Sequence, residues 1–186
     1  MIRKPVDLGV FGEYLHYGMP LSLVTVLDEN GRVNISTIAS LTPMPGEPAR
    51  IAMGILEENY SSKLVEKEGE FAVNFVTPDM RPIVRACGSY SGKDVNKIEL
   101  CNLHPLPARH IAAPLLQECP LNIECRVSEV LKMDGLNLFV AEILEMVVDE
   151  TLSDGHNGVL LEQLNPLFYA FGHTFARGPM IGRDAL

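Results

Sequence analysis

One stretch, LNIECRVSEVLKMDGLNLFVAEILEMVVDE at 121–150, restricts the possible folds of this chain more than any other. Apolar and polar residues alternate on both sides of Asp134 and Gly135, and an Asp-Gly pair between alternating runs is the strongest short-range signal of a β-hairpin. The stretch therefore predicts two long antiparallel strands joined by a tight turn.

The rest of the chain also favours strands over helices. A second hairpin signal covers 21–40, with DENG at 28–31 as the turn, and short helices are predicted over 59–69 and 77–88. Pro82 implies that the second helix is brief or kinked. Single strands are predicted at 49–56, at 70–76 and near 167–171, whereas the proline-rich segment 88–120 reads as loop. With 186 residues, these elements predict one mainly β domain, an antiparallel barrel with a few short helices.

Composition excludes several classes of function. The net charge is −9 and the 15 basic residues are scattered, which argues against binding to nucleic acid. The apolar runs are too short to span a bilayer. Near the amino terminus, Asp7, Gly9 and Glu13 interrupt any apolar stretch that could serve as a signal peptide. We therefore expect a cytoplasmic protein that does not bind membranes. The four cysteines contain no C-x-x-C pair and are expected to be reduced and mostly buried.

The motifs of common enzyme classes are missing. The segment GSYSGKD at 88–94 resembles a phosphate-binding P-loop, but its glycine spacing is one residue short and Asp94 stands where Ser or Thr is needed. The sequence contains neither the dinucleotide motif G-x-G-x-x-G nor the nucleophile motif G-x-S-x-G. The five histidines stand apart, and no metal site is predicted. Catalysis by side chains alone is therefore poorly supported.

Two polar segments remain as candidates for binding. A strand edge with Asn34, Ser36 and Thr37 presents amide and hydroxyl groups that suit a flat polar heterocycle. A helix that begins with Ser61, Ser62 and Lys63 offers free N–H groups, hydroxyls and a positive charge that suit a phosphate monoester. The alternative is that these hydroxyls only satisfy the local backbone.

The order of four segments adds to this interpretation. VTVLDENGRVNISTIASLTPMPGEPARIAMGI, NYSSKLVEKEGEFAVNFV, CGSYSGKDVNKIE and LNIECRVSEVLKMDGLNLFVAEI follow one another along the chain. In this order they resemble the flavin reductase-like FMN-binding split-barrel proteins, most closely the flavoredoxin branch, over roughly residues 18–175. The resemblance implies a six-stranded antiparallel split β-barrel that forms a homodimer, with one non-covalent FMN per subunit.

The resemblance also assigns residues to the cofactor. It implies that the isoalloxazine and ribityl groups contact Asn34, Ser36, Thr37, Ile38, Ala39 and Ser40. It implies that the phosphate contacts Ser61, Ser62 and Lys63, with Lys97 near the phosphate or ribityl end and Lys93 as a weaker substitute. The chain departs from the family at two of its flavin positions, since Ser40 stands where tryptophan is common and Asn137 where histidine is frequent.

The expected function is an NAD(P)H-dependent flavin oxidoreductase that passes electrons through FMN to an acceptor. In this interpretation the N–H groups of Thr37, Ile38 and Ala39 face the ring edge that becomes negative on reduction. A second interpretation is an FMN electron-transfer protein fed by a partner protein, and a third is a barrel without cofactor. The tail at 168–175 is expected to pack on the other subunit near the flavin.

Overall fold

The computed structural model describes residues 18–156, 158–160, 163–170 and 172–179. The expectations for the amino terminus and for Phe171 lie outside these residues. The strands are β1 (Met19–Pro20), β2 (Ser22–Leu27), β3 (Val33–Ile38), β4 (Leu41–Met44), β5 (Arg50–Leu56), β6 (Glu70–Phe75), β7 (Pro105–Leu106), β8 (Leu115–Leu116), β9 (Leu121–Met133), β10 (Leu136–Val148), β11 (Phe168–Ala170) and β12 (His173–Phe175). The helices are α2 (Tyr60–Glu68), α3 (Arg81–Ser89) and α4 (Lys97–Cys101), with 3₁₀ turns η2 (Pro78–Met80) and η3 (Glu150–Leu152).

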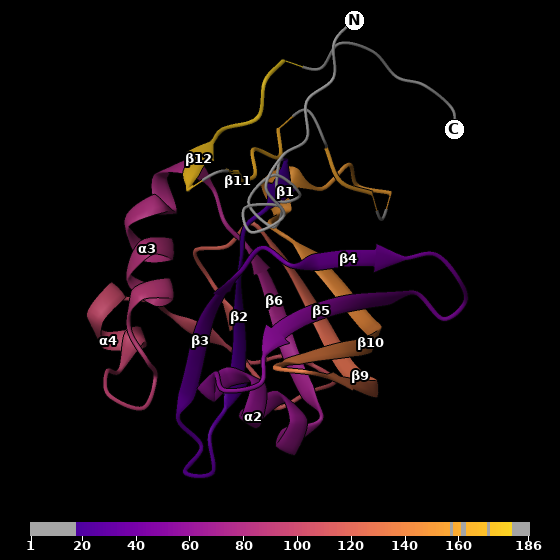
Figure 1. Cartoon of the computed structure of the whole chain (residues 1–186). Coiled ribbons are helices and arrows are strands. Elements are labelled where there is room, and N and C mark those ends of the chain that lie inside the picture. Colours follow the sequence, from indigo (N-terminus) through magenta and orange to yellow (C-terminus); the bar gives the residue numbers. More distant parts are fainter. Residues whose placement is uncertain (1–17, 157, 161–162, 171, 180–186) are drawn as a thin grey trace, which may run out of the picture.

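The main sheet is antiparallel and has seven strands in the order β3-β2-β6-β9-β10-β5-β4. It forms the expected mainly β split barrel, with α3 and α4 on one side and α2 at one end (Figure 1). The sheet has seven strands where six were expected. The additional strand is β4, which the sequence did not indicate because it contains a proline. Pro43 lacks an N–H group, but among the described strands β4 pairs only with β5, so it lies at the sheet edge, where proline is tolerated.

The two long hairpins form as the turn signals predict. Strands β9 and β10 pair over 13 residues each, and register shifts after Val140 and Ile143 mark irregular positions in the ladder. Such bulges bend and twist a strand, which helps a sheet to curve into a barrel. Gly69 ends α2 in the left-handed conformation with φ of 69°, as a helix C-cap glycine does.

Three segments differ from the sequence prediction. The helix predicted over 77–88 divides into η2 and α3, and Pro82 is the second residue of α3, where a missing N–H costs nothing. The segment predicted as loop contains α4 and the small β7–β8 sheet. The tail forms β11 and β12, and β11 pairs with β1 of the same chain.

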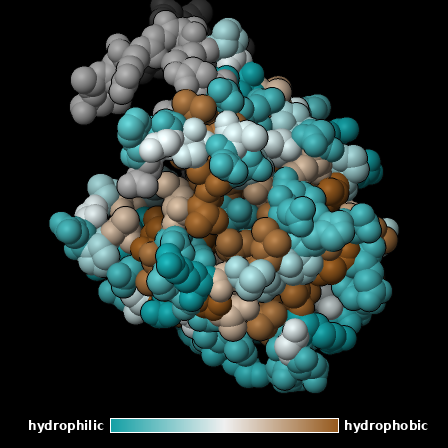
Figure 2. Space-filling model, turned by 180° about the vertical axis from the view of Figure 1, so that it is seen from behind, coloured by the Kyte–Doolittle hydropathy of each residue, from teal (hydrophilic) through white to brown (hydrophobic). Residues whose placement is uncertain are grey.

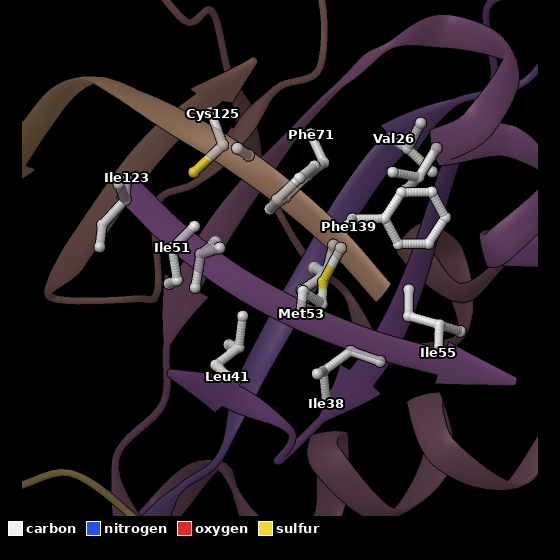
Figure 3. Packing of buried hydrophobic residues seen from close by; sticks show 14 of the residues in the cluster. Val26, Ile38, Leu41, Ile51, Met53, Ile55, Phe71, Ile123, Cys125 and Phe139 are labelled. Atoms are coloured by element: carbon white, nitrogen blue, oxygen red, sulfur yellow. The ribbon is translucent and has the colours of Figure 1, made fainter. Parts of the chain in front are cut away.

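Hydrophobic side chains fill both sides of the sheet. Inside the barrel, Phe71, Phe139 and Met53 are fully buried and pack with aliphatic residues from β2, β5 and β9 (Figure 3). A second cluster joins Leu23 and Ile35 of the sheet to residues of α3, including Val84 and Cys87. The two clusters fix β3 between the barrel interior on one side and α3 on the other.

A buried carboxylate holds the long connection between α4 and β9. Glu124 of β9 is 1% exposed and accepts hydrogen bonds from the backbone N–H groups of Arg109 (2.8 Å) and His110 (2.7 Å). Glu70 of β6 accepts another from the N–H of Ala112. These bonds satisfy loop donors that the loop itself leaves unpaired.

Replacing Glu124 by alanine should therefore destabilise the fold. The variant leaves two N–H groups without their charged acceptor, and we expect a loss of about 3 kcal/mol in the free energy of unfolding, measured by urea denaturation. Glu129→Ala, at an exposed position on the same strand, is the matched control and should change stability by less than about 0.5 kcal/mol. Equal effects of the two substitutions would show that Glu124 does not anchor the loop.

Candidate functional site

The site is built on the free edge of β3. Among the described strands it pairs only with β2, so one side of its backbone has no strand partner in that part of the chain. The carbonyl of Ile35 accepts a hydrogen bond from Lys97 and must therefore point away from β2. Because backbone direction alternates along an antiparallel strand, the N–H and C=O groups of Thr37 point outward as well, whereas those of Ile38 face β2. The strand thus offers a row of outward polar backbone groups.

The side chains of β3 divide between two neighbouring helices. Asn34 and Ser36 lie on the face toward α2, and both contact Ser61: the amide Nδ2 of Asn34 donates to its Oγ at 2.8 Å, and the two serine hydroxyls share a short hydrogen bond. Thr37 lies on the other face and donates from Oγ1 to the carbonyl of Val84 in α3, at 2.7 Å. This alternation is the ordinary two-residue period of a strand.

The start of α2 presents unpaired donors to the same edge. The side chain of Asn59 makes no capping bond, and the N–H groups of Tyr60 and Ser61 have no hydrogen-bond partner among the described residues. The first N–H groups of a helix carry the positive end of the helix dipole. Since Ser61 accepts from Asn34, its own hydroxyl proton is free to donate to Ser36 or to an anion in the cleft.

Lys97 connects two elements of the site, β3 and α3, through hydrogen bonds. Its ammonium is 4% exposed and donates to the carbonyls of Ile35 (2.6 Å) and Cys87 (2.7 Å), so it joins the edge of β3 to α3. Burial lowers the pKa of this ammonium below its ordinary value. Burial also raises the pKa of the Cys87 thiol to about 12, which keeps that thiol protonated and a poor nucleophile.

The segment after α3 forms the opposite wall. A Cβ atom added to Gly92 would lie 1.9 Å from Oδ1 of Asn34, so only glycine allows this close approach. That Oδ1 atom is buried without a hydrogen-bond partner among the described residues. The side chain of Lys93 extends beside the wall, with Nζ 5.3 Å from the centre of the Tyr60 ring.

These parts enclose a cleft of about 260 Å³. Of the residues predicted from sequence, Ser36, Thr37, Ile38, Ser61 and Lys97 line it. Asn34 reaches it through Ser61 and also lines an adjoining hollow of about 110 Å³, together with Lys93. Ala39 lines a larger groove that shares Thr37, Gly88 and Ser89 with the cleft. The predicted strand edge and helix start therefore meet at one place.

The other predicted residues lie apart from the cleft lining. Ser40 donates to the carbonyl of Gly54 and is directed to β5. Lys63 is exposed and lines a separate hollow beside Glu57 and Glu58. Ser62 and Asn137 are fully buried and bond to each other, from Nδ2 to Oγ at 3.0 Å. The reason is helical geometry: successive residues on a helix point about 100° apart, so Ser61, Ser62 and Lys63 face three directions.

Sequence reasoning missed most of the far wall. The cleft is also lined by Ile55, Asn59, Tyr60, Cys87, Gly88, Ser89, Tyr90, Ser91 and Gly92. The segment GSYSG at 88–92 resembles a P-loop and lies within one of the four segments of the family resemblance, but none of its residues was assigned to the cofactor. Its small and hydroxyl residues were the available signal, because such residues allow a backbone to approach a ligand or a neighbouring strand closely.

The fold and the cleft define a class of protein, an antiparallel split barrel with a polar cleft on one strand edge. The model of the flavin reductase like domain matches residues 14–176, and the chain belongs to this family. An uncharacterized protein of Archaeoglobus fulgidus is 28% identical over 141 residues, which cover 76% of this chain and 80% of that protein. The resemblance noted in the sequence is thereby confirmed.

Solved structures share the whole fold. Flavoredoxin of Desulfovibrio vulgaris (Miyazaki F) has a TM-score of 0.87 at 24% identity, over 97% of each chain. An FMN-binding protein from Thermus thermophilus has a TM-score of 0.78 at 22% identity, over 100% of this chain and 99% of that one. At these identities the structures show a common fold, the expected split barrel. Within the described part of the chain, none of the helices is both long and apolar enough to span a bilayer.

Gly92→Ala tests the close approach at the cleft wall. The new methyl group must displace the buried Asn34 amide, which breaks its bond to Ser61, and we expect a loss of about 1–3 kcal/mol in the free energy of unfolding by urea denaturation. Gly178→Ala is the control, because a methyl group there meets open space among the described residues. A Gly92→Ala variant as stable as this control would contradict the packing described.

Lys97→Met tests the link between β3 and α3. Methionine keeps the chain length but leaves the carbonyls of Ile35 and Cys87 without their charged donor, so stability should fall by about 2 kcal/mol. The edge of β3 should also loosen, which hydrogen exchange of the Ile38 amide, which faces β2, would detect as faster exchange. Unchanged exchange at Ile38 would show that Lys97 does not hold this edge in place.

Proposed function

We propose that this protein binds FMN in the cleft beside β3 and acts as an NAD(P)H-dependent flavin oxidoreductase. The observation that carries the proposal is the meeting of the outward backbone groups of Thr37 with the unpaired N–H groups of Tyr60 and Ser61. One set suits a planar heterocycle with carbonyl and ring nitrogen acceptors, and the other suits a phosphate. Membership of the flavin reductase like domain family and the FMN-binding protein of the same fold support this reading.

The residues present fit a phosphate at the start of α2. Two N–H donors and the hydroxyl groups of Ser61 and Ser36 converge there, and none of the described residues that line the cleft carries a carboxylate. Lys97 adds a positive charge to the cleft floor, although its proton donors are directed to two carbonyls. The Asn34 amide donates a hydrogen bond to Ser61 Oγ. The proton of the serine hydroxyl is not used in this bond, so it can still be donated toward the cleft.

The fit of the ring rests on the backbone rather than on side chains. The outward N–H of Thr37 can donate to the edge of a flat ring without any reorganisation of the strand. Bound FMN would supply the redox chemistry, which is two-electron uptake from a reduced nicotinamide and one- or two-electron release to an acceptor. The protein's share is to bind the ring, orient it along β3 and place donors where negative charge develops.

Space beside the cleft supports a soluble electron donor. The groove that adjoins it has a volume of about 690 Å³, within the range of small-molecule sites. Burial raises the pKa of the Cys87, Cys119 and Cys125 thiols, which makes these three poor nucleophiles. The electron-transfer protein fed by a partner is the second interpretation, and the loss of tryptophan at Ser40 and of histidine at Asn137 is what favours it.

We further propose that the protein is a cytoplasmic homodimer. Hydrophobic side chains are exposed in the middle of the face opposite to that of Figure 1, with hydrophilic ones around them (Figure 2). The large exposed hydrophobic residues of the described chain include Leu56, Leu131, Met133 and Met146. Extended apolar surface of this kind often marks an interface. Whether the tail at 168–175 also contacts the other subunit stays a prediction. In the single chain, β11 pairs with β1, and Thr174 of β12 accepts a hydrogen bond from Arg81 of α3.

The visible absorption spectrum of the purified protein tests the proposal. We expect a flavin spectrum, release of FMN on denaturation as identified by its mass, and bleaching within seconds when NADH or NADPH is added without oxygen. Bleaching only by dithionite would contradict the NAD(P)H reaction and leave the electron-transfer protein. A protein that is colourless and takes up no added FMN would contradict both.

A further inference from the structure

A groove beside the cleft offers space for a second molecule. It has a volume of about 690 Å³, and it shares Thr37, Gly88 and Ser89 with the cleft, so a molecule in the groove would lie directly against one in the cleft. One wall is α3 and the other is the tail strand β12, joined to α3 by a hydrogen bond from Nε of Arg81 to Oγ1 of Thr174 at 3.0 Å. Thus the groove is open at the surface but has defined walls.

Two arginines line this groove from one helix. Arg81 and Arg85 are four residues apart on α3, so both side chains lie on the same face of the helix. Both are exposed, and neither forms an ion pair with an acidic side chain of the described residues. Like charges at this spacing repel each other, and α3, all of whose residues are described, contains no acidic side chain that would offset the repulsion.

The net charge of the chain is −9, so acidic side chains are in excess. Some exposed basic residues pair with them, as Arg32 does with Asp28 and Lys132 with Glu66, whereas Arg81 and Arg85 do not among the described residues. Two neighbouring guanidinium groups without acids at the mouth of a groove are therefore available for a ligand. Guanidinium groups bind phosphate through paired hydrogen bonds, and two of them suit a group with two linked negative charges.

We propose that Arg81 and Arg85 form a subsite for the pyrophosphate of the nicotinamide dinucleotide that reduces the flavin. The inference rests on the proposed function and deepens it, because it assigns a place to the electron donor. The pyrophosphate binds at α3, and the nicotinamide end extends past Gly88 and Ser89 to the cleft. With flavin bound in the cleft, hydride would pass from the nicotinamide to the flavin, so the dinucleotide would be oxidised and the flavin reduced. The arginines bind and orient the donor and take no part in the transfer.

Titration calorimetry with inorganic pyrophosphate tests the subsite by itself. The purified flavin-loaded protein should bind pyrophosphate, and Arg85→Ala should weaken that binding roughly tenfold or more. Arg50→Ala removes the same charge from the β4–β5 hairpin, which extends away from α3, and should leave binding unchanged (Figure 1). Arg85→Ala is preferred to Arg81→Ala, since Arg81 also holds the tail. No binding by the unaltered protein, or equal binding by all variants, would overturn the subsite.

Steady-state kinetics then test its role. Arg85→Ala should raise the KM for NADH and NADPH roughly tenfold with little change in kcat, because only binding of the donor is lost. 1-Benzyl-1,4-dihydronicotinamide carries the same hydride but no phosphate, and its rate of oxidation should be equal in both proteins. An equal loss with this donor would overturn the proposal. If flavin binds and neither dinucleotide reduces it, the proposed function fails, while the pyrophosphate titration still decides the subsite.

Discussion

The hydrogen bonds of Lys97 are the interaction on which the site depends. A single buried ammonium joins the free edge of β3 to the last turns of α3, and it does so at the carbonyls of Ile35 and Cys87. Without this link, an edge strand presents an unprotected row of backbone groups, which proteins commonly cover or block. Here the edge is held open but enclosed, with α2 on one face and α3 on the other. A cleft lined by backbone donors results.

The same arrangement explains why few side chains of the site are chemically reactive. The cleft contains hydroxyl groups, glycines and backbone amides, its thiol at Cys87 is kept protonated by burial, and the ammonium of Lys97 is engaged by two carbonyls. Such a site can bind and polarise a cofactor. The chain's membership of the flavin reductase like domain family agrees with chemistry that belongs to the bound group.

The elements that local signals determine could be predicted from the sequence. The turn at Asp134 and Gly135, the hairpin at 21–40 and the end of α2 at Gly69 all formed as their residues indicate. Strand β4 could not be predicted, because whether Pro43 is tolerated depends on its position at the sheet edge. The same limit applies to the site. Ser61 and Lys63 are two residues apart in sequence, yet only their place on α2 sends one into the cleft and the other to solvent.

The most direct test of the central claim is to compare the binding of FMN and riboflavin, which differ only by the phosphate. Dissociation constants from fluorescence titration should show roughly tenfold or tighter binding of FMN, and Ser61→Ala should reduce that ratio severalfold by weakening FMN alone. This result would place the phosphate at the start of α2. An FMN to riboflavin ratio that Ser61→Ala leaves unchanged would contradict the account, because the phosphate would then lie elsewhere.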